Sequence, residues 1–194
     1  MSLRKLTRIV ITVSLILGIV LITACSSNNA TPTPIYQRFS DAKLKAGDTL
    51  PAPTGDVILT VTGKIGTKNG DDNIVMDRDM IESVGQVEYK VTDPFETKDY
   101  VYRGPLMSDL LDLWKVSSDA TTMEVVALDD YVVKVPIADL RKYPVLFALQ
   151  QDGQYMPVST RGPAMLVFPY NNFEFNQTVY NDYWAWQIKS IDIS

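Results

Sequence analysis

The sequence contains no histidine and only one cysteine, Cys25. Without imidazole there is no Ser-His-Asp or Cys-His machinery, no imidazole proton shuttle and no histidine metal site. If Cys25 serves as an anchor, no thiol remains for a disulfide, a thiolate nucleophile or a soft-metal ligand. Any active site must therefore be built from carboxylates, lysine, arginine, tyrosine or hydroxyl groups.

Clustered positive charge is also missing from this chain. The net charge is −5 and the pI is about 4.7, whereas nucleic-acid binding draws its affinity from grouped Lys and Arg. We therefore expect no nucleic-acid partner. The composition, with 46% hydrophobic and 21% charged residues, is typical of a globular domain.

The first residues have the pattern of a secretory leader. Arg4, Lys5 and Arg8 precede an apolar run over residues 9–22, and two small residues come before Cys25. With a rise of about 1.5 Å per residue, this run is short for a hydrocarbon core of about 30 Å. We therefore predict a signal peptide over residues 1–24 rather than a permanent transmembrane helix.

The segment Ile22-Thr23-Ala24-Cys25 resembles the lipobox of bacterial lipoproteins, in which the cysteine is lipidated and becomes the mature N-terminus. An ordinary signal peptide that happens to end at a cysteine is the alternative. The resemblance implies an extracytoplasmic, membrane-anchored lipoprotein, on the periplasmic side in a Gram-negative cell. Residues 25–50 are expected to hold the lipidated Cys25 and a flexible, proline-bearing tether.

The remainder predicts one α+β domain over residues 57–194. Capping residues and helical spacing predict helices over 76–85 and 105–114. Turn residues at Asp129-Asp130 and over 151–154 predict two hairpins. β-branched or alternating runs predict strands over 57–63, 87–91, 123–128, 131–135, 145–149, 155–158, 164–168 and 184–193. Many short strands with few helices are typical of the α+β class.

Several patterns, taken in order, resemble the molybdopterin-binding domain of the sulfite oxidase family. They are LTVTG at 59–63, YRGPL at 102–106 followed by DLL at 109–111, ALDDY at 127–131, RGP at 161–163 and WAWQIKSI at 184–191. The resemblance covers about residues 57–194. It implies a sulfite-oxidase-type fold, with mixed β-sheets and a few short helices.

The chain departs from the catalytic members of that family. Those members bind molybdenum through a cysteine between the strand near Val91 and the helix near Leu110, and this interval has none here. The histidine that many members carry before the position of Arg161 is missing too, and Arg4-Lys5 is not the twin arginine typical of enzymes exported with a loaded metal cofactor. These absences speak against molybdenum and, on balance, against an enzyme.

The chain resembles a cysteine-less branch of this fold that binds reduced pterins in the periplasm. Members of that branch regulate a membrane protein that makes or degrades cyclic di-GMP. The resemblance implies a lipid-anchored, non-enzymatic pterin sensor that acts on a membrane cyclic di-GMP cyclase or phosphodiesterase. Two alternatives remain: a molybdenum-cofactor oxidoreductase without the usual cysteine ligand, and an interaction module without a ligand.

A pterin is a flat bicycle, so its site needs a face for stacking and polar groups along the ring edge. Stacking candidates are Trp184 and Trp186, with Tyr170 and Tyr183, although each could instead belong to the core. Other candidates are polar residues beside predicted turns and glycines. Arg161 and Arg103 could stack on the ring or donate to its carbonyl. Asp93, Thr92 and Asp130 could accept from its N–H groups. Solvated loop cations and ordinary turn residues are the structural alternatives. We predict no catalytic residue and no metal ligand.

Overall fold

The computed structural model describes residues 34–194. The predicted signal peptide, Cys25 and the first part of the tether lie outside the described residues. Within this range the helices are short: α1 (Arg78–Glu82), α2 (Met107–Leu113), α3 (Ile137–Lys142) and α4 (Gln177–Tyr180). No helix in residues 34–194 has the length and apolar character needed to cross a membrane.

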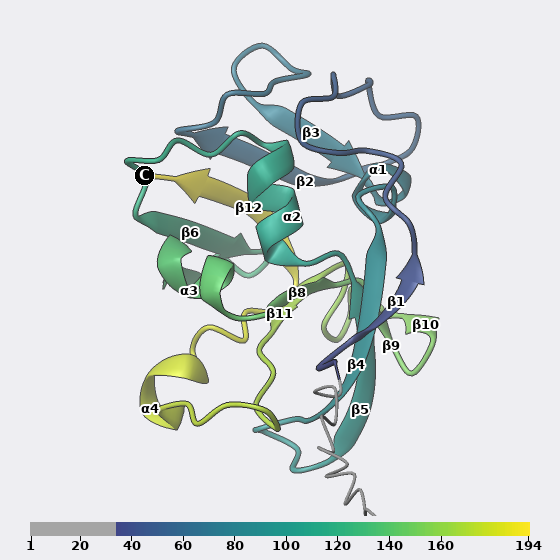
Figure 1. Ribbon diagram of the computed structural model, residues 1–194, viewed down its shortest axis with the longest axis vertical. Coiled ribbons are helices and arrows are strands. Elements are labelled where there is room, and N and C mark those ends of the chain that lie inside the picture. Colours follow the sequence, from purple (N-terminus) through teal and green to yellow (C-terminus); the bar gives the residue numbers. More distant parts are fainter. Residues whose placement is uncertain (1–33) are drawn as a thin grey trace, which may run out of the picture. The chain divides into compact units, whose positions relative to one another are not determined.

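Two five-stranded sheets and one strand pair form the framework of residues 34–194 (Figure 1). The first sheet has the order β1 (Gln37–Ser40), β4 (Gln86–Thr92), β5 (Asp99–Gly104), β9 (Gln150–Gln151), β10 (Gln154–Tyr155). The second has the order β3 (Ile74–Asp77), β2 (Val57–Gly63), β12 (Ile188–Ile193), β6 (Thr122–Ala127), β7 (Val132–Pro136). The pair consists of β8 (Leu146–Ala148) and β11 (Met165–Val167). Because β12 runs parallel to β2 and antiparallel to β6, the second sheet is mixed, which confirms the predicted fold class.

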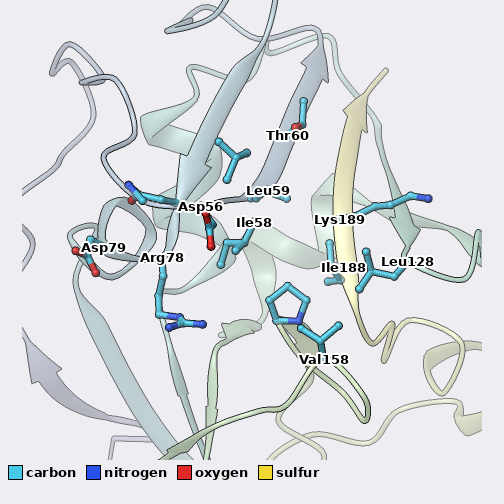
Figure 2. Close-up of a pocket in the computed structure, with 14 residues that line it drawn as sticks. Asp56, Ile58, Leu59, Thr60, Arg78, Asp79, Leu128, Val158, Ile188 and Lys189 are labelled. Atoms are coloured by element: carbon cyan, nitrogen blue, oxygen red, sulfur yellow. The ribbon is translucent and has the colours of Figure 1, made fainter.

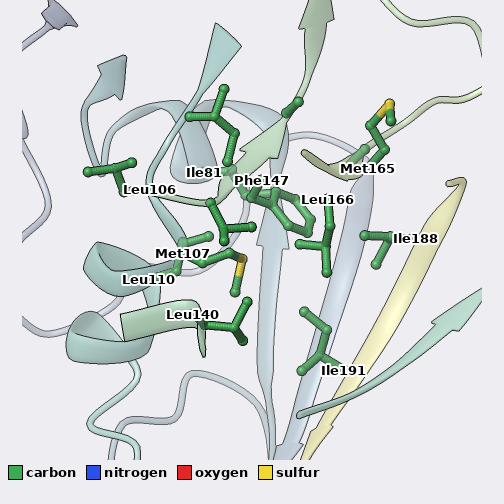
Figure 3. Packing of buried hydrophobic residues seen from close by; sticks show 14 of the residues in the cluster. Ile81, Leu106, Met107, Leu110, Leu140, Phe147, Met165, Leu166, Ile188 and Ile191 are labelled. Carbon is green, nitrogen blue, oxygen red and sulfur yellow. The ribbon is translucent and has the colours of Figure 1, made fainter. Parts of the chain in front are cut away.

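One hydrophobic cluster joins the helices to the sheets. Figure 3 shows side chains of α2 and α3 facing the same core as side chains from β8, β11 and β12: Met107, Leu110, Leu140, Phe147, Leu166 and Ile191. The predicted helical stripe of Leu106, Leu110, Leu113 and Trp114 is buried throughout. Burial of this apolar surface, at about 25 cal/mol per Å², is the main force that holds the layers together.

The ordered domain begins earlier than the sequence predicted. Residues 37–40, placed in the tether by their polar surroundings, form β1 and pair antiparallel with β4. Leu50 is buried in the core as well. β1 pairs with the edge of β4, whose backbone N–H and C=O groups would otherwise lack partners. The pattern of side chains in residues 37–40 does not predict this pairing.

The first predicted hairpin is confirmed and the second is partly wrong. β6 and β7 pair across Asp129-Asp130, where Asp130 takes the left-handed conformation with φ of 66°. The turn at Asp152-Gly153 also exists, but it joins the two-residue strands β9 and β10. The apolar run that begins at Val145 forms β8, which pairs with β11 instead, because both strands are fully buried and find partners in the core rather than along the chain.

The last strand is shorter than predicted. β12 begins at Ile188 rather than at Trp184, because Gln187 has a φ of 51° and interrupts the extended backbone. Trp184 and Trp186 therefore do not follow the alternation of a strand. They lie on the loop that leads into β12.

Candidate ligand-binding site

A buried ionic cluster links three distant segments of the chain. Asp93 follows β4, Tyr102 lies on β5, and Arg161 precedes β11. Arg161 Nη1 donates to Asp93 Oδ2 at 2.6 Å and to the Tyr102 hydroxyl at 2.8 Å, while that hydroxyl donates to Asp93 Oδ2 at 3.2 Å. Arg161 Nη2 also donates to Glu96 Oε1 at 2.6 Å. These contacts fix the segments relative to one another.

Neighbouring residues in the sequence hold Asp93 and Arg161 in place. Asp93 Oδ1 accepts from the backbone N–H groups of Phe95 and Glu96 at 2.8 and 2.9 Å, an Asx-type turn that aspartate favours. On the other side, a Cβ at Gly162 would lie 1.9 Å from the carbonyl oxygen of Met156, so only glycine fits beside Arg161. The glycine of the RGP motif is thus required because the backbone at Gly162 passes close to the backbone at Met156.

The ion pairs and hydrogen bonds of this cluster offset the cost of burying its charged groups. The Asp93 side chain is fully buried, and that of Arg161 is 8% exposed. Burial by itself would lower the pKa of Arg161, but Tyr102, Asp93 and Glu96 outweigh it, so the pKa of the guanidinium is raised. Burial raises the pKa of the Tyr102 phenol well above its ordinary value. Tyr102 therefore stays protonated and donates, and Arg161 stays charged.

The cluster supports one wall of a pocket. The guanidinium carbon of Arg161 lies 4.7 Å from the ring centroid of Trp186, and the Arg161 carbonyl accepts from the Gln187 N–H at 3.0 Å. Phe95 packs edge-on against Trp186, with ring centroids 5.4 Å apart. Arg161 therefore positions the Trp186 indole from behind.

We call the cavity in front of Trp186 the aromatic pocket. It has a volume of about 270 Å³ and lies among the loop after β4, the β6–β7 turn and the loop before β12. Its lining consists of Phe95, Ala127, Asp129, Tyr131, Asn181, Asp182, Trp184, Ala185, Trp186 and Gln187. The lining offers rings for stacking together with carboxylates and amides for hydrogen bonding.

Trp184 is the most enclosed large side chain of the aromatic pocket. It is 2% exposed and packs edge-on against Tyr102 and tilted against Tyr170, with centroid distances of 6.1 and 5.5 Å. Its indole Nε1 has no hydrogen-bond partner within residues 34–194, and the same holds for Trp186 Nε1. A buried N–H without a partner costs about 1–3 kcal/mol, so these donors favour a ligand that can accept from them.

Four of the predicted ligand residues come together here. Trp184 and Trp186 line the aromatic pocket, and Arg161 stacks behind Trp186. Asp93 lies beneath them, with both oxygens already occupied. The predicted ligand role of Asp93 is therefore replaced by a structural one, while contact of the tryptophans with a ligand stays a prediction. Tyr170 and Tyr183 pack in the aromatic cluster behind Trp184 and outside the lining.

The other three predicted residues lie outside the aromatic pocket. Arg103 forms a half-buried ion pair with Glu88 at 2.7 Å and stacks on Phe39 of β1. Thr92 donates its hydroxyl to Asp99 at the end of the sheet. Asp130 has a left-handed backbone and pairs with Lys189 at 2.6 Å, whereas its neighbour Asp129 lines the pocket.

Phe95, Tyr131 and Asp182 were not selected as ligand residues from the sequence. Phe95 and Tyr131 are about half exposed, and they belong to the cavity only because separate loops meet there. Tyr131 donates its hydroxyl to the carbonyl of Asp182 at 3.3 Å and so joins two of these loops. The ALDDY motif was a usable signal for this turn, but it did not show which aspartate faces inward.

A larger depression lies elsewhere, on the surface near β2 and β12, with a volume of about 560 Å³. Figure 2 shows Arg78 and Asp79 on one side of it and Lys189 with Leu128 on the other. None of the predicted ligand residues lines it. It combines exposed apolar side chains with scattered charges of both signs, and no buried polar group among its lining residues lacks a partner. The aromatic pocket is therefore the better candidate.

Comparison with known proteins agrees with this architecture. Residues 81–173 match the family model of the oxidoreductase molybdopterin binding domain. No curated protein matches the chain. Among solved structures, the sulfane dehydrogenase SoxCD from Paracoccus pantotrophus is similar with a TM-score of 0.53 and 14% sequence identity, over 70% of this chain and 37% of that longer chain. The chain thus has the fold of the oxidoreductase molybdopterin-binding domain, of the sulfite oxidase type.

Proposed function

We propose that this domain binds a pterin in the aromatic pocket. The observation that carries the proposal is that the buried Trp184, whose indole N–H has no partner within residues 34–194, lines a cavity together with Trp186 and Phe95. A pterin has flat faces for stacking, a carbonyl and ring nitrogens that accept from an N–H, and an amino group that donates to carboxylates. The family match supports the proposal, because it concerns a domain that binds a pterin-containing cofactor.

The finer form of the proposal is a lipid-anchored sensor outside the cytoplasm. The anchor and the location follow from the lipobox resemblance around Cys25 and remain part of the proposal. Action on a membrane cyclic di-GMP enzyme rests on the resemblance to the cysteine-less branch alone, and the comparisons lend it no support. Its test comes after that of ligand binding.

A molybdenum-cofactor oxidoreductase is a second candidate. The match to the oxidoreductase molybdopterin binding domain and the likeness to SoxCD favour it, so the expectation against molybdenum gains no support from the comparisons. The side chains do not fit a metal held through a protein thiolate. Residues 34–194 contain no cysteine and no group of three potential His, Cys, Asp or Glu ligands, and Asp93 is fully hydrogen-bonded. A cofactor would have to be held here through its organic part alone.

Analysis of the purified full-length protein, expressed in cells that make the molybdenum cofactor, separates these candidates. We would measure metal content by mass spectrometry and pterin content by fluorescence after oxidation, and then titrate ligand-free protein with dihydroneopterin by calorimetry. Pterin binding without stoichiometric molybdenum supports the proposal. Stoichiometric molybdenum favours the second candidate. If the protein contains no molybdenum and binds no pterin at millimolar ligand, both candidates are rejected.

A further inference from the structure

The charged groups that line the aromatic pocket are all acidic. Asp129 and Asp182 contribute carboxylates, and the described lining includes no lysine or arginine. Two cations on neighbouring segments form ion pairs outside the lining. Arg161 is bound to Asp93 and Glu96, each at 2.6 Å, and Lys189 is bound to Asp130 at 2.6 Å. A ligand in this pocket therefore meets two carboxylates, and no lysine or arginine of residues 34–194 belongs to the lining.

The buried part of the lining needs a hydrogen-bond acceptor rather than a donor. The indole N–H of Trp184 needs an acceptor, and Trp184 itself is almost completely enclosed. The amide side chains of Asn181 and Gln187 also line the pocket, although Gln187 Nε2 already donates to the carbonyl of Val158 at 2.6 Å. The lining residues thus include an unpartnered donor on Trp184 and carboxylate acceptors on Asp129 and Asp182. A neutral heterocycle with a carbonyl and an amino group satisfies both.

We infer that the aromatic pocket selects pterins without a phosphate group. This inference rests on the proposed function and narrows it to a ligand class. The ring accepts from Trp184 and donates its amino and N–H groups to the carboxylates, whereas a phosphate brings negative charge to Asp129 and Asp182 without a cation to receive it. Molybdopterin carries a phosphate, so the rule also separates free pterins from the metal cofactor that the family name suggests.

The discrimination is electrostatic, and its dependence on salt follows from that. Both carboxylates lie at the accessible part of the lining, where water and ions weaken the repulsion. We expect a phosphorylated pterin to bind at least about tenfold more weakly than its unphosphorylated counterpart at low ionic strength. The gap narrows as salt is added, because the Debye length falls to about 8 Å near physiological ionic strength.

The test is a calorimetric titration of the full-length protein with dihydroneopterin and with dihydroneopterin triphosphate, each at low and high salt. The double variant Asp129→Asn with Asp182→Asn should lose most of the discrimination. A second double variant, Asp41→Asn with Asp71→Asn, makes the same change in net charge at exposed positions outside the pocket and should keep the discrimination.

Each outcome has one meaning. Weaker binding of the triphosphate, relieved only in the pocket variant, supports the inference. Equal or tighter binding of the triphosphate overturns charge selection and leaves pterin binding intact. An equal loss of discrimination in both double variants attributes the effect to net charge and overturns the role of the pocket. Failure of both ligands to bind rejects the proposed function itself.

Discussion

Replacing Asp93 with asparagine tests the buried cluster on which the aromatic pocket rests. The change keeps the size of the side chain and the acceptor for the backbone N–H groups of Phe95 and Glu96, but it removes the charge that faces Arg161. Breaking a fully buried ion pair costs about 3–5 kcal/mol. Arg161 would keep Glu96, whose side chain is 42% exposed and compensates partly. We therefore expect Asp93→Asn to lower the free energy of unfolding by about 2–4 kcal/mol.

Urea denaturation followed by circular dichroism and tryptophan fluorescence measures this loss. The single variants Asp93→Asn and Arg161→Met and their double variant form a cycle, and residues that share a buried contact should show a coupling of about 1–3 kcal/mol. Asp112→Asn is the matched control. It breaks an exposed ion pair with Arg141 whose length, 2.7 Å, is close to the 2.6 Å of the buried pair, so it should cost less than about 1 kcal/mol.

The cluster hypothesis also predicts an effect on the pocket. Because Arg161 lies behind Trp186, the Arg161→Met variant should alter the emission of Trp186 and weaken pterin binding even at temperatures where the variant is fully folded. A loss below about 1 kcal/mol for Asp93→Asn, or additive single changes without coupling, would refute the reasoning that the pair is a buried structural anchor.

Three further predictions concern the site and its surroundings. Trp184→Phe removes the unpartnered N–H, and calorimetry should show pterin affinity falling about tenfold, whereas Trp114→Phe in the remote core should lower the melting temperature and leave affinity unchanged. Arg103→Met should change affinity less than about twofold, because Arg103 is bound to Glu88; a larger loss in the same titration would place it in the site. Asp77→Ala removes the cap of α1 and should cost about 1–3 kcal/mol in urea unfolding near pH 7. Burial opposes ionisation of Asp77, but hydrogen bonds from the backbone N–H groups of Gly55, Met80 and Thr54 outweigh it and lower the pKa of Asp77. The stabilisation by Asp77 is therefore fully present above the pKa of the unfolded state, about 3.9, and is lost as the pH falls through the lower pKa of the folded state. The difference from the native protein should therefore shrink below about pH 4, and a difference independent of pH would show that the carboxylate charge is irrelevant.

The sequence by itself determined the elements that depend on local periodicity. Neighbouring residues are enough to predict three elements, because alternation and helical spacing follow directly from backbone geometry. These elements are the strand Val57–Gly63, the apolar face of α2 and the β6–β7 hairpin. The ordered motifs were sufficient to indicate the family of fold. Trp184, Trp186 and Arg161 could be selected as candidates from the sequence motifs that contain them, and their contact with a ligand stays a prediction.

Tertiary structure alone decided which of these residues share a site. β8 pairs with β11 rather than with its neighbour in sequence, and the loops that carry Asp93 and Arg161 meet although 68 residues separate them. Such contacts depend on how buried surfaces fit together, and no local pattern records that fit. For the same reason the sequence could not show that Asp129 lines the pocket while Asp130 pairs with Lys189, because both residues belong to the same turn and only its position against other segments distinguishes them.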